Sequence, residues 1–148
     1  MDAQTATAIA SVSVAIAVAL ITRRQWITNR NILKHQLFDR RYEIFERITG
    51  FLADVIQAGA VAPGSDREFL RDTKKAYFVF ASDPDVKTLV SDIYSRAAQL
   101  HTLEAERASL KGGALNANIA SQREIKDWFS STLASMEARF DKYLRLEH

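Results

Sequence analysis

The sequence predicts an all-α protein in which an N-terminal transmembrane helix precedes an antiparallel bundle of about four helices. Three observations predict this class. Residues 3–22 are uncharged and largely apolar, later apolar residues recur at three- and four-residue spacing, and only five Gly and two Pro interrupt 148 residues. We therefore divide the chain into a membrane anchor at residues 1–22 and a helical bundle at residues 23–145. Residues 146–148 are set aside as the remnant of a purification tag.

The anchor is predicted from its length and its flanks. About 20 residues at 1.5 Å each make a helix of about 30 Å, the thickness of the hydrocarbon core of a bilayer. Arg23 and Arg24 follow directly, which places the N-terminus outside and the bundle in the cytoplasm, and Trp26 comes next at interfacial depth. Two alternatives are a cleaved signal peptide with its site at 17–19, for which the basic leader is missing, and a buried soluble helix.

Small residues within the anchor fall on two broadly opposite faces of a helix. One row is Ala3, Thr7, Ser11, Ala15 and Ala19, and the other is Ala6, Ala10, Ser13 and Ala17. Such rows let helix backbones approach closely in lipid, so the anchor predicts a homo-oligomer, and two rows suit a ring better than a dimer. Ser and Ala also alternate with Val, Ile and Leu, as in a strand, but a lone strand in lipid would leave its backbone unpaired.

The excess positive charge follows the anchor. Residues 23–47 carry seven basic and three acidic side chains, whereas residues 48–145 carry 13 of each. We call four of these residues the basic collar: Arg23, Arg24, Arg30 and Lys34. Each such charge contributes about 1 kcal/mol near an anionic leaflet, so the collar predicts contact with anionic lipid; setting the topology alone is an equal alternative. Nucleic-acid binders more often spread basic charge over a folded domain, so no nucleic-acid partner is expected.

Helix signals then divide the rest of the chain. Apolar residues from Leu37 to Ile56 predict a helix that continues from the anchor and ends at Gly59 and Pro63-Gly64. Ser65-Asp66-Arg67-Glu68 is a capping box that predicts a helix extending to Phe80.

Two further helices complete the predicted bundle. Asp83-Pro84 predicts an N-cap and first helical residue, with the helix running towards Gly112-Gly113. The last helix is expected to start between Leu115 and Ser121, where 121–124 form a second possible capping box, and to reach Leu144. Short turns between four such helices favour an antiparallel bundle.

No catalytic, metal or cofactor site is predicted. Cysteine is absent, and the sequence has no phosphate-binding glycine loop, nucleophile elbow or zinc-protease motif. His35 and Asp39 are spaced for one helix face, where a solvent-exposed ion pair is favoured over a metal site. His101 is expected to be a packed or surface residue, with a ligand or pH-sensing role as the alternative. We therefore expect a protein that is not an enzyme.

Charged residues within the bundle are also given structural roles. Asp83 and Asp85 flank Pro84, which favours helix capping over cation binding. The pairs 40–41 and 74–75 are interpreted as solvated faces, with phosphate contact as the alternative. Arg41 lies in the register of the core stripe, so it needs a carboxylate partner if buried, or else reaches the surface.

The run from Leu33 to Phe45, placed just after the anchor, resembles a group of small bacterial membrane-anchored helical proteins without assigned function. Residues 78–80, 93–94 and 128–129 fit the same pattern. The resemblance implies bacterial origin, an inner-membrane location and a helical fold, and supplies no activity or site residues.

Together these features predict a membrane-anchored helical interaction or scaffold protein. It is expected to self-associate through the anchor and to present its bundle to a cytoplasmic protein partner. The alternative is a small homo-oligomeric pore with Ser11 as a candidate lining residue. A membrane-tethered enzyme, the third possibility, would need a site built from Asp, Glu, Arg and Tyr.

Overall fold

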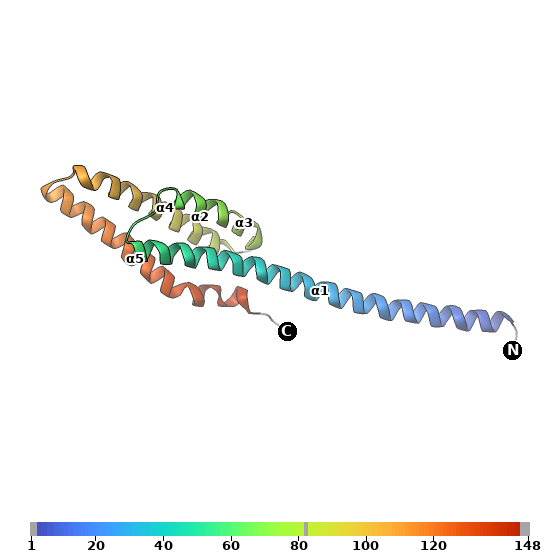
Figure 1. The fold of residues 1–148 in the computed structure, drawn as a ribbon. Coiled ribbons are helices and arrows are strands. Elements are labelled where there is room, and N and C mark those ends of the chain that lie inside the picture. The colour runs from blue at the N-terminus through green and yellow to red at the C-terminus, as the bar shows by residue number, and fades with distance from the viewer. Residues whose placement is uncertain (1–2, 82, 146–148) are drawn as a thin grey trace. The chain divides into compact units, whose positions relative to one another are not determined.

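The structure, a computed structural model, is all-α as predicted (Figure 1). It describes residues 3–81 and 83–145, with side chains from Ala15 onward, and contains no strand within those ranges. Residues 146–148, which the sequence analysis interprets as a tag remnant, lie outside the described part. The chain forms two compact units, Met1–Leu37 and Phe38–His148.

Helix α1 runs without interruption over Ala3–Ala58, which confirms that the anchor segment and the first helix of the bundle are continuous. Its buried stripe begins at Ile44 and continues through Ile48, Leu52 and Val55. The helix ends at Gly59, whose φ of 67° is the left-handed conformation that glycine adopts without a steric penalty. The Gly59 N–H donates to the carbonyl of Val55 at 2.9 Å, so the predicted end of this helix is confirmed.

The predicted membrane span at residues 3–22 lies mostly outside the residues whose side chains are described. In the part of the chain that the structure describes, no helix has both the length and the apolar character needed to cross a membrane.

The helix predicted from Ser65 to Phe80 is divided into α2 (Ser65–Thr73) and α3 (Ala76–Val79). The buried Thr73 hydroxyl donates to the Phe69 carbonyl at 2.7 Å, and the next N–H, of Lys74, bonds three residues back to Arg71 at 3.4 Å. A threonine that bonds its own helix backbone tends to bend the helix, which explains a break here.

The predicted capping box at the start of α2 is wrong. The N-cap residue is Gly64, at φ 82°, and its carbonyl accepts the Glu68 N–H at 3.1 Å. The Ser65 hydroxyl instead donates backwards to the carbonyl of Ala62 at 2.8 Å. It is therefore engaged in the preceding turn.

Helix α4 (Pro84–Glu106) begins as predicted, because the Asp83 carboxylate accepts the Asp85 N–H at 2.9 Å and Pro84 is the first helical residue. A short 3₁₀ helix, η1 (Arg107–Ser109), follows. Helices α4 and α5 then form an antiparallel hairpin (Figure 1).

Helix α5 (Gly112–Leu144) begins earlier than predicted, and the second capping box is wrong. Gln122 lies inside the helix and is buried. Its amide donates to the Asn118 side-chain oxygen at 2.8 Å, and the Asn118 amide donates to the Leu103 carbonyl at 3.0 Å. Because these buried amides need partners, their contact with the end of α4 holds the first turns of α5 in place.

The core of the Phe38–His148 unit is a single apolar cluster to which each of its α-helices contributes. Phe140 of α5 is fully buried, with its ring centroid 5.4 Å from that of Phe45 in α1 and 5.7 Å from that of Phe80, which follows α3. Phe51 of α1 packs on Phe69 of α2 at 4.5 Å. The helical bundle is therefore confirmed.

Phe140→Ala is expected to lower the free energy of unfolding by about 3–5 kcal/mol, because it opens a cavity where three segments meet. Phe78→Ala is the matched control: Phe78 is 80% exposed, and its truncation is expected to cost less than about 0.5 kcal/mol. Urea denaturation of a chain lacking residues 1–22 measures both. Equal losses would contradict the proposed central role of Phe140.

Candidate functional site

The basic collar lies on α1, with Arg23, Arg24, Arg30 and Lys34 all exposed. The Arg30 guanidinium lies 5.5 Å from the centre of the Trp26 ring, one helical turn earlier. Of the small residues in the anchor, Ala15, Ala17 and Ala19 are exposed. The other predicted packing positions, Ala3, Ala6, Thr7, Ala10, Ser11 and Ser13, have side chains outside the described part.

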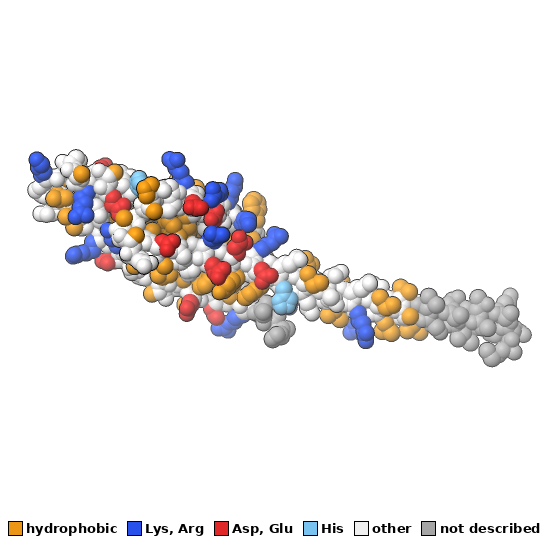
Figure 2. All heavy atoms as spheres, viewed as in Figure 1, with side chains coloured by type: hydrophobic (Ala, Val, Ile, Leu, Met, Phe, Trp, Pro, Cys, Tyr) orange, Lys and Arg blue, Asp and Glu red, His pale blue; other side chains and the backbone are white. Residues whose placement is uncertain are grey.

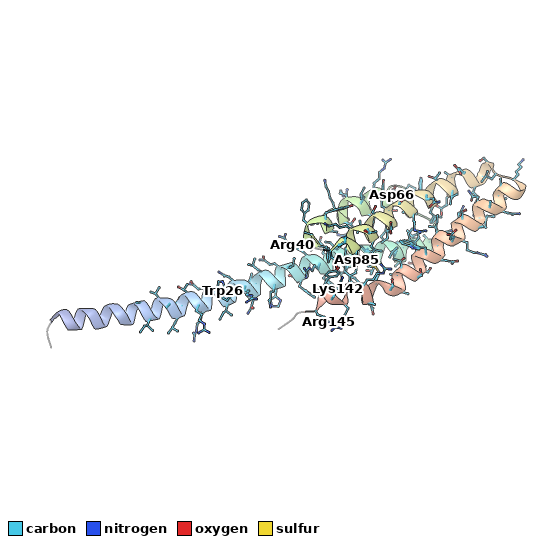
Figure 3. The ribbon with its side chains drawn as sticks, turned by 180° about the vertical axis from the view of Figure 1, so that it is seen from behind. Trp26, Arg40, Asp66, Asp85, Lys142 and Arg145 are labelled. Atoms are coloured by element: carbon cyan, nitrogen blue, oxygen red, sulfur yellow. The ribbon has the colours of Figure 1, made fainter. Side chains whose placement is uncertain are left out.

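Large apolar side chains accompany the collar. Trp26 is 62% exposed and Leu33 is 64% exposed, with Ile27, Ile32 and Leu37 also exposed. Figure 3 shows Trp26 directed outward from α1. Residues 3–38 contain no acidic residue, and the described side chains from Ala15 to Leu37 are exposed, so the charged groups beside these exposed apolar residues are all basic.

A polar cluster joins the start of α4 to the end of α5. Besides capping α4, the Asp83 carboxylate accepts hydrogen bonds from the Lys142 ammonium at 2.6 Å and from the Tyr143 hydroxyl. Lys142 also lies 4.0 Å from the Asp85 carboxylate, and Figure 3 labels both residues. Sequence analysis identified the cap but missed Lys142 and Tyr143, which are about 60 residues away and carry no motif.

The electrostatics of this cluster follow from these contacts. Hydrogen bonds from Lys142, then from Tyr143 and from the Asp85 N–H, lower the pKa of Asp83 from 3.8 to about 2. The Asp83 carboxylate raises the pKa of Lys142. Burial, followed by the hydrogen bond to Asp83, raises the pKa of the Tyr143 hydroxyl. All three groups are thus held in the protonation state that joins the helix ends.

Arg41 behaves differently from either predicted outcome. It is half-buried, and its guanidinium lies 5.8 Å from the ring centres of both Phe80 and Tyr143. One terminal nitrogen donates to the Tyr143 carbonyl at 3.5 Å, while its buried Nε has no hydrogen-bond partner among the described residues. Two aromatic faces and a carbonyl therefore take the place of the expected carboxylate.

A groove of about 540 Å³ lies between α4 and α5 beside this cluster. Its polar lining mixes Asp85, Asp92 and Asp141 with Arg139 and Lys142. Trp128 forms part of the wall, and the Arg96 guanidinium stacks 4.4 Å above its ring. The charges of the two signs are interspersed, so the groove presents no concentrated charge to a ligand.

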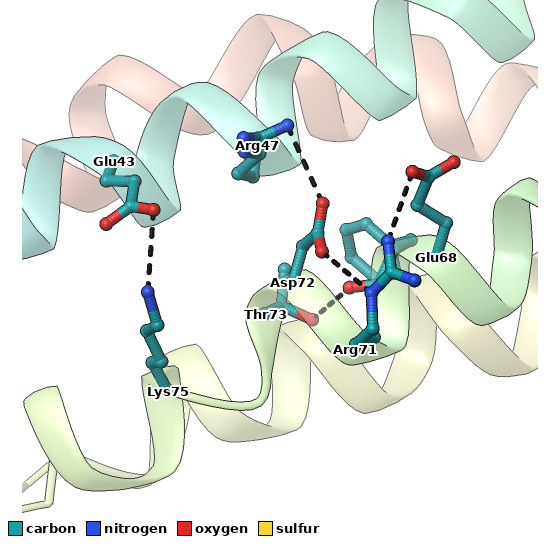
Figure 4. Close-up of polar contacts among 8 residues, drawn as sticks. Glu43, Arg47, Glu68, Arg71, Asp72, Thr73 and Lys75 are labelled. Atoms are coloured by element: carbon teal, nitrogen blue, oxygen red, sulfur yellow. Dashed lines mark hydrogen bonds and ion pairs between the residues drawn. The ribbon is translucent and has the colours of Figure 1, made fainter.

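A second ion-pair group joins α1 to the α2–α3 segment (Figure 4). Arg47 lies 3.6 Å from Asp72, and Lys75 lies 3.7 Å from Glu43. Asp72 also pairs with Arg71 at 3.3 Å. Exposed pairs of this kind contribute little stability individually, so they align the two helices on a packing already set by Phe51 and Phe69.

The remaining candidate residues lie on the surface. His35, Asp39 and His101 are exposed, as are Arg40 and Lys74. In the described ranges no group of three His, Asp or Glu is arranged to hold a metal ion. Figure 2 shows basic and acidic side chains interspersed over the visible face of the bundle.

Comparisons with protein-family models, curated proteins and solved structures found no match. The resemblance to small bacterial membrane-anchored helical proteins therefore stays a prediction.

Asp83→Asn is expected to destabilise the bundle, since asparagine keeps the N-cap but loses the ionic bond to Lys142. The loss is expected to be smaller than that caused by Phe140→Ala. Asp92→Asn, an exposed carboxylate on the same helix, is the control and is expected to leave the urea midpoint unchanged. A larger effect at Asp92 would contradict the assigned role of Asp83.

The stability from Asp83 is also expected to depend on pH. Its pKa is lower in the folded chain than the ordinary 3.8, so its contribution is complete above that value. As the pH falls from 3.8 to about 2, the carboxylate is protonated and the contribution disappears. Urea titrations of the original chain and Asp83→Asn should therefore differ at about pH 7 and converge at low pH. A constant difference would contradict this assignment.

Proposed function

We propose that this chain is a membrane-anchored helical interaction protein that self-associates through residues 3–22 and presents its bundle to a cytoplasmic partner. The observation that carries the proposal is the change of character along α1. Before Phe38 the described side chains of this helix are exposed and rich in apolar and basic residues, whereas from Ile44 it contributes a buried stripe to a bundle with its own core. A helix of this kind is suited to join a lipid environment to a folded module.

The chemistry of the bundle supports an interaction role over an enzymatic one. Three of the four described groups with clearly shifted pKa values, Asp83, Lys142 and Tyr143, bond to one another and hold two helix ends together. The fourth, Arg145, pairs with Asp141 one turn earlier on the surface. The groove next to them mixes both signs of charge. These features support a folded surface that binds a partner over a reaction site. The proposed location is the inner membrane, with the bundle in the cytoplasm.

Membrane anchoring predicts that the full chain resists carbonate extraction from membranes, whereas a chain lacking residues 1–22 is released. The physical reason is the uncharged apolar stretch of about 30 Å in helical form. Release of the full chain by carbonate would contradict the proposed anchor.

Self-association predicts that Ala17→Leu reduces crosslinking between copies in membranes by about fivefold or more, equivalent to about 1 kcal/mol. A bulky side chain in a small-residue row keeps helix backbones apart. Val18→Leu, one bulky residue for another at the same depth, is the control and is expected to crosslink normally. A monomeric original chain, or equal effects of both substitutions, would contradict this interface.

The pore alternative stays a prediction, because its lining residue Ser11 lies outside the described side chains. Ion flux through liposomes that disappears on Ser11→Leu would favour a pore over an interaction protein.

A further inference from the structure

The segment of α1 between the anchor and the bundle, residues 23–37, has two different faces. Arg23, Arg30 and Lys34 are separated by seven and four residues, so all three lie within about 20° of one line at about 100° per residue. Trp26, Leu33 and Leu37 lie along one side of this line, and Ile27 along the other. We call this set the basic–apolar face.

The opposite side of the same helix is mainly uncharged and polar. It carries Gln25, Thr28, His35 and Gln36, with Ile32 as its one large apolar residue. Arg24 lies about 100° away from the line of cations. The segment is thus amphipathic. Trp26 and Leu33 are both exposed, and among the described residues only the Arg30 guanidinium is recorded over the Trp26 ring.

The charge of this face limits what can cover it. Residues 3–38 contain no Asp or Glu, so a parallel second copy would bring Arg23 and Arg30 against the same two cations. Like charges in a helix–helix interface are destabilising and act against that pairing. A complementary surface must therefore supply negative charge together with apolar contacts.

Distance along the helix argues against lipid as the cover for the whole face. If the anchor ends at Thr22, Leu33 lies about 16 Å and Leu37 about 22 Å beyond that point in an unbroken helix. The headgroup layer on each side of a bilayer is only about 5–8 Å thick. Arg23 and Arg24 fall within that layer, whereas Leu33 and Leu37 lie beyond it.

We propose that the basic–apolar face docks an acidic amphipathic helix of a partner protein. Carboxylates of the partner would pair with Arg23 and Arg30, and its apolar residues would cover Trp26 and Leu33. Helices of this kind bind through apolar anchors spaced three or four residues apart, and guanidinium–carboxylate pairs fix their register. The distance argument rests on the proposed anchor, while the charge argument holds without it.

The test uses the full chain in nanodiscs of neutral phosphatidylcholine. The probe is a labelled synthetic helix with Leu at its heptad core positions and Glu beside them, and the control peptide has Gln in place of Glu. Fluorescence anisotropy is expected to show binding of the Glu peptide at least about tenfold tighter than of the Gln peptide. Equal affinities would overturn the proposal.

Variants of the chain test which side of the helix is used. Arg30→Gln and Leu33→Gln are each expected to weaken binding of the Glu peptide by about fivefold or more. Arg24→Gln removes the same charge from the same collar but on another side, and is expected to change affinity less than about twofold. Equal losses for Arg24→Gln and Arg30→Gln would show general attraction to cations and overturn the assigned face.

A spin label tests whether lipid, rather than a partner helix, covers the basic–apolar face, because a lipid-covered label would be shielded from water. Because the chain has no cysteine, Leu37→Cys gives a single site for a spin label on the basic–apolar face, at the end that lies beyond the headgroup layer. The label is expected to stay accessible to water in neutral nanodiscs and in nanodiscs containing anionic phosphatidylglycerol. Burial of the label in the anionic lipid would overturn the proposal in favour of a lipid cover.

Two measurements separate the proposed membrane anchor from the proposed docking face. Co-elution of the chain with nanodiscs tests whether residues 3–22 anchor the chain. Repeating the peptide titration in detergent micelles tests whether the basic–apolar face prefers the Glu peptide, whether or not residues 3–22 span a bilayer.

Discussion

The packing of Phe140 is the contact on which the rest of the bundle depends. Its ring touches Phe45 of α1 and Phe80 after α3, so it joins segments that lie far apart in the chain. Phe80 and Tyr143 then pack edge to face at 4.9 Å and provide the aromatic faces on which Arg41 rests. With Tyr143 held there, its hydroxyl reaches Asp83 at the start of α4. The polar cluster is thus positioned by apolar packing, as expected when hydrophobic burial supplies most of the stability.

Local sequence signals predicted the elements whose causes are themselves local. The spacing of Ile44, Ile48 and Val55 gave the buried face of α1, and Asp83-Pro84 gave the start of α4. The predictions were wrong where a contact with a residue far along the chain determines the local structure. The amides of Asn118 and Gln122 belong inside α5 because Leu103 offers its carbonyl, and the pattern at 121–124 carries no trace of that contact.

The candidate site divides in the same way. The basic collar was predictable because basic residues that follow an uncharged segment can be identified directly from the sequence. The bond from Lys142 to Asp83 spans 59 residues and depends on how α4 and α5 meet, so no spacing rule identifies it. Arg41 was recognised as unusual from its register alone. Its aromatic partners become apparent only when Phe80 and Tyr143 are brought together.

The continuity of α1 gives the two proposals a common geometry. A helix keeps its angular order along its length, so Arg24 lies within about 20° of Ala17, seven residues earlier, and on the side of the second small-residue row. Arg23 and Arg30 lie about 120° and about 140° from Ala17. Copies that associate through this row would therefore leave the basic–apolar face open, with Arg24 near lipid phosphates that offset its charge. Assembly through this second row and docking of an acidic partner would then use different sides of one helix, whereas the first row, which contains Ala15 and Ala19, lies on the side of Trp26 and Leu33.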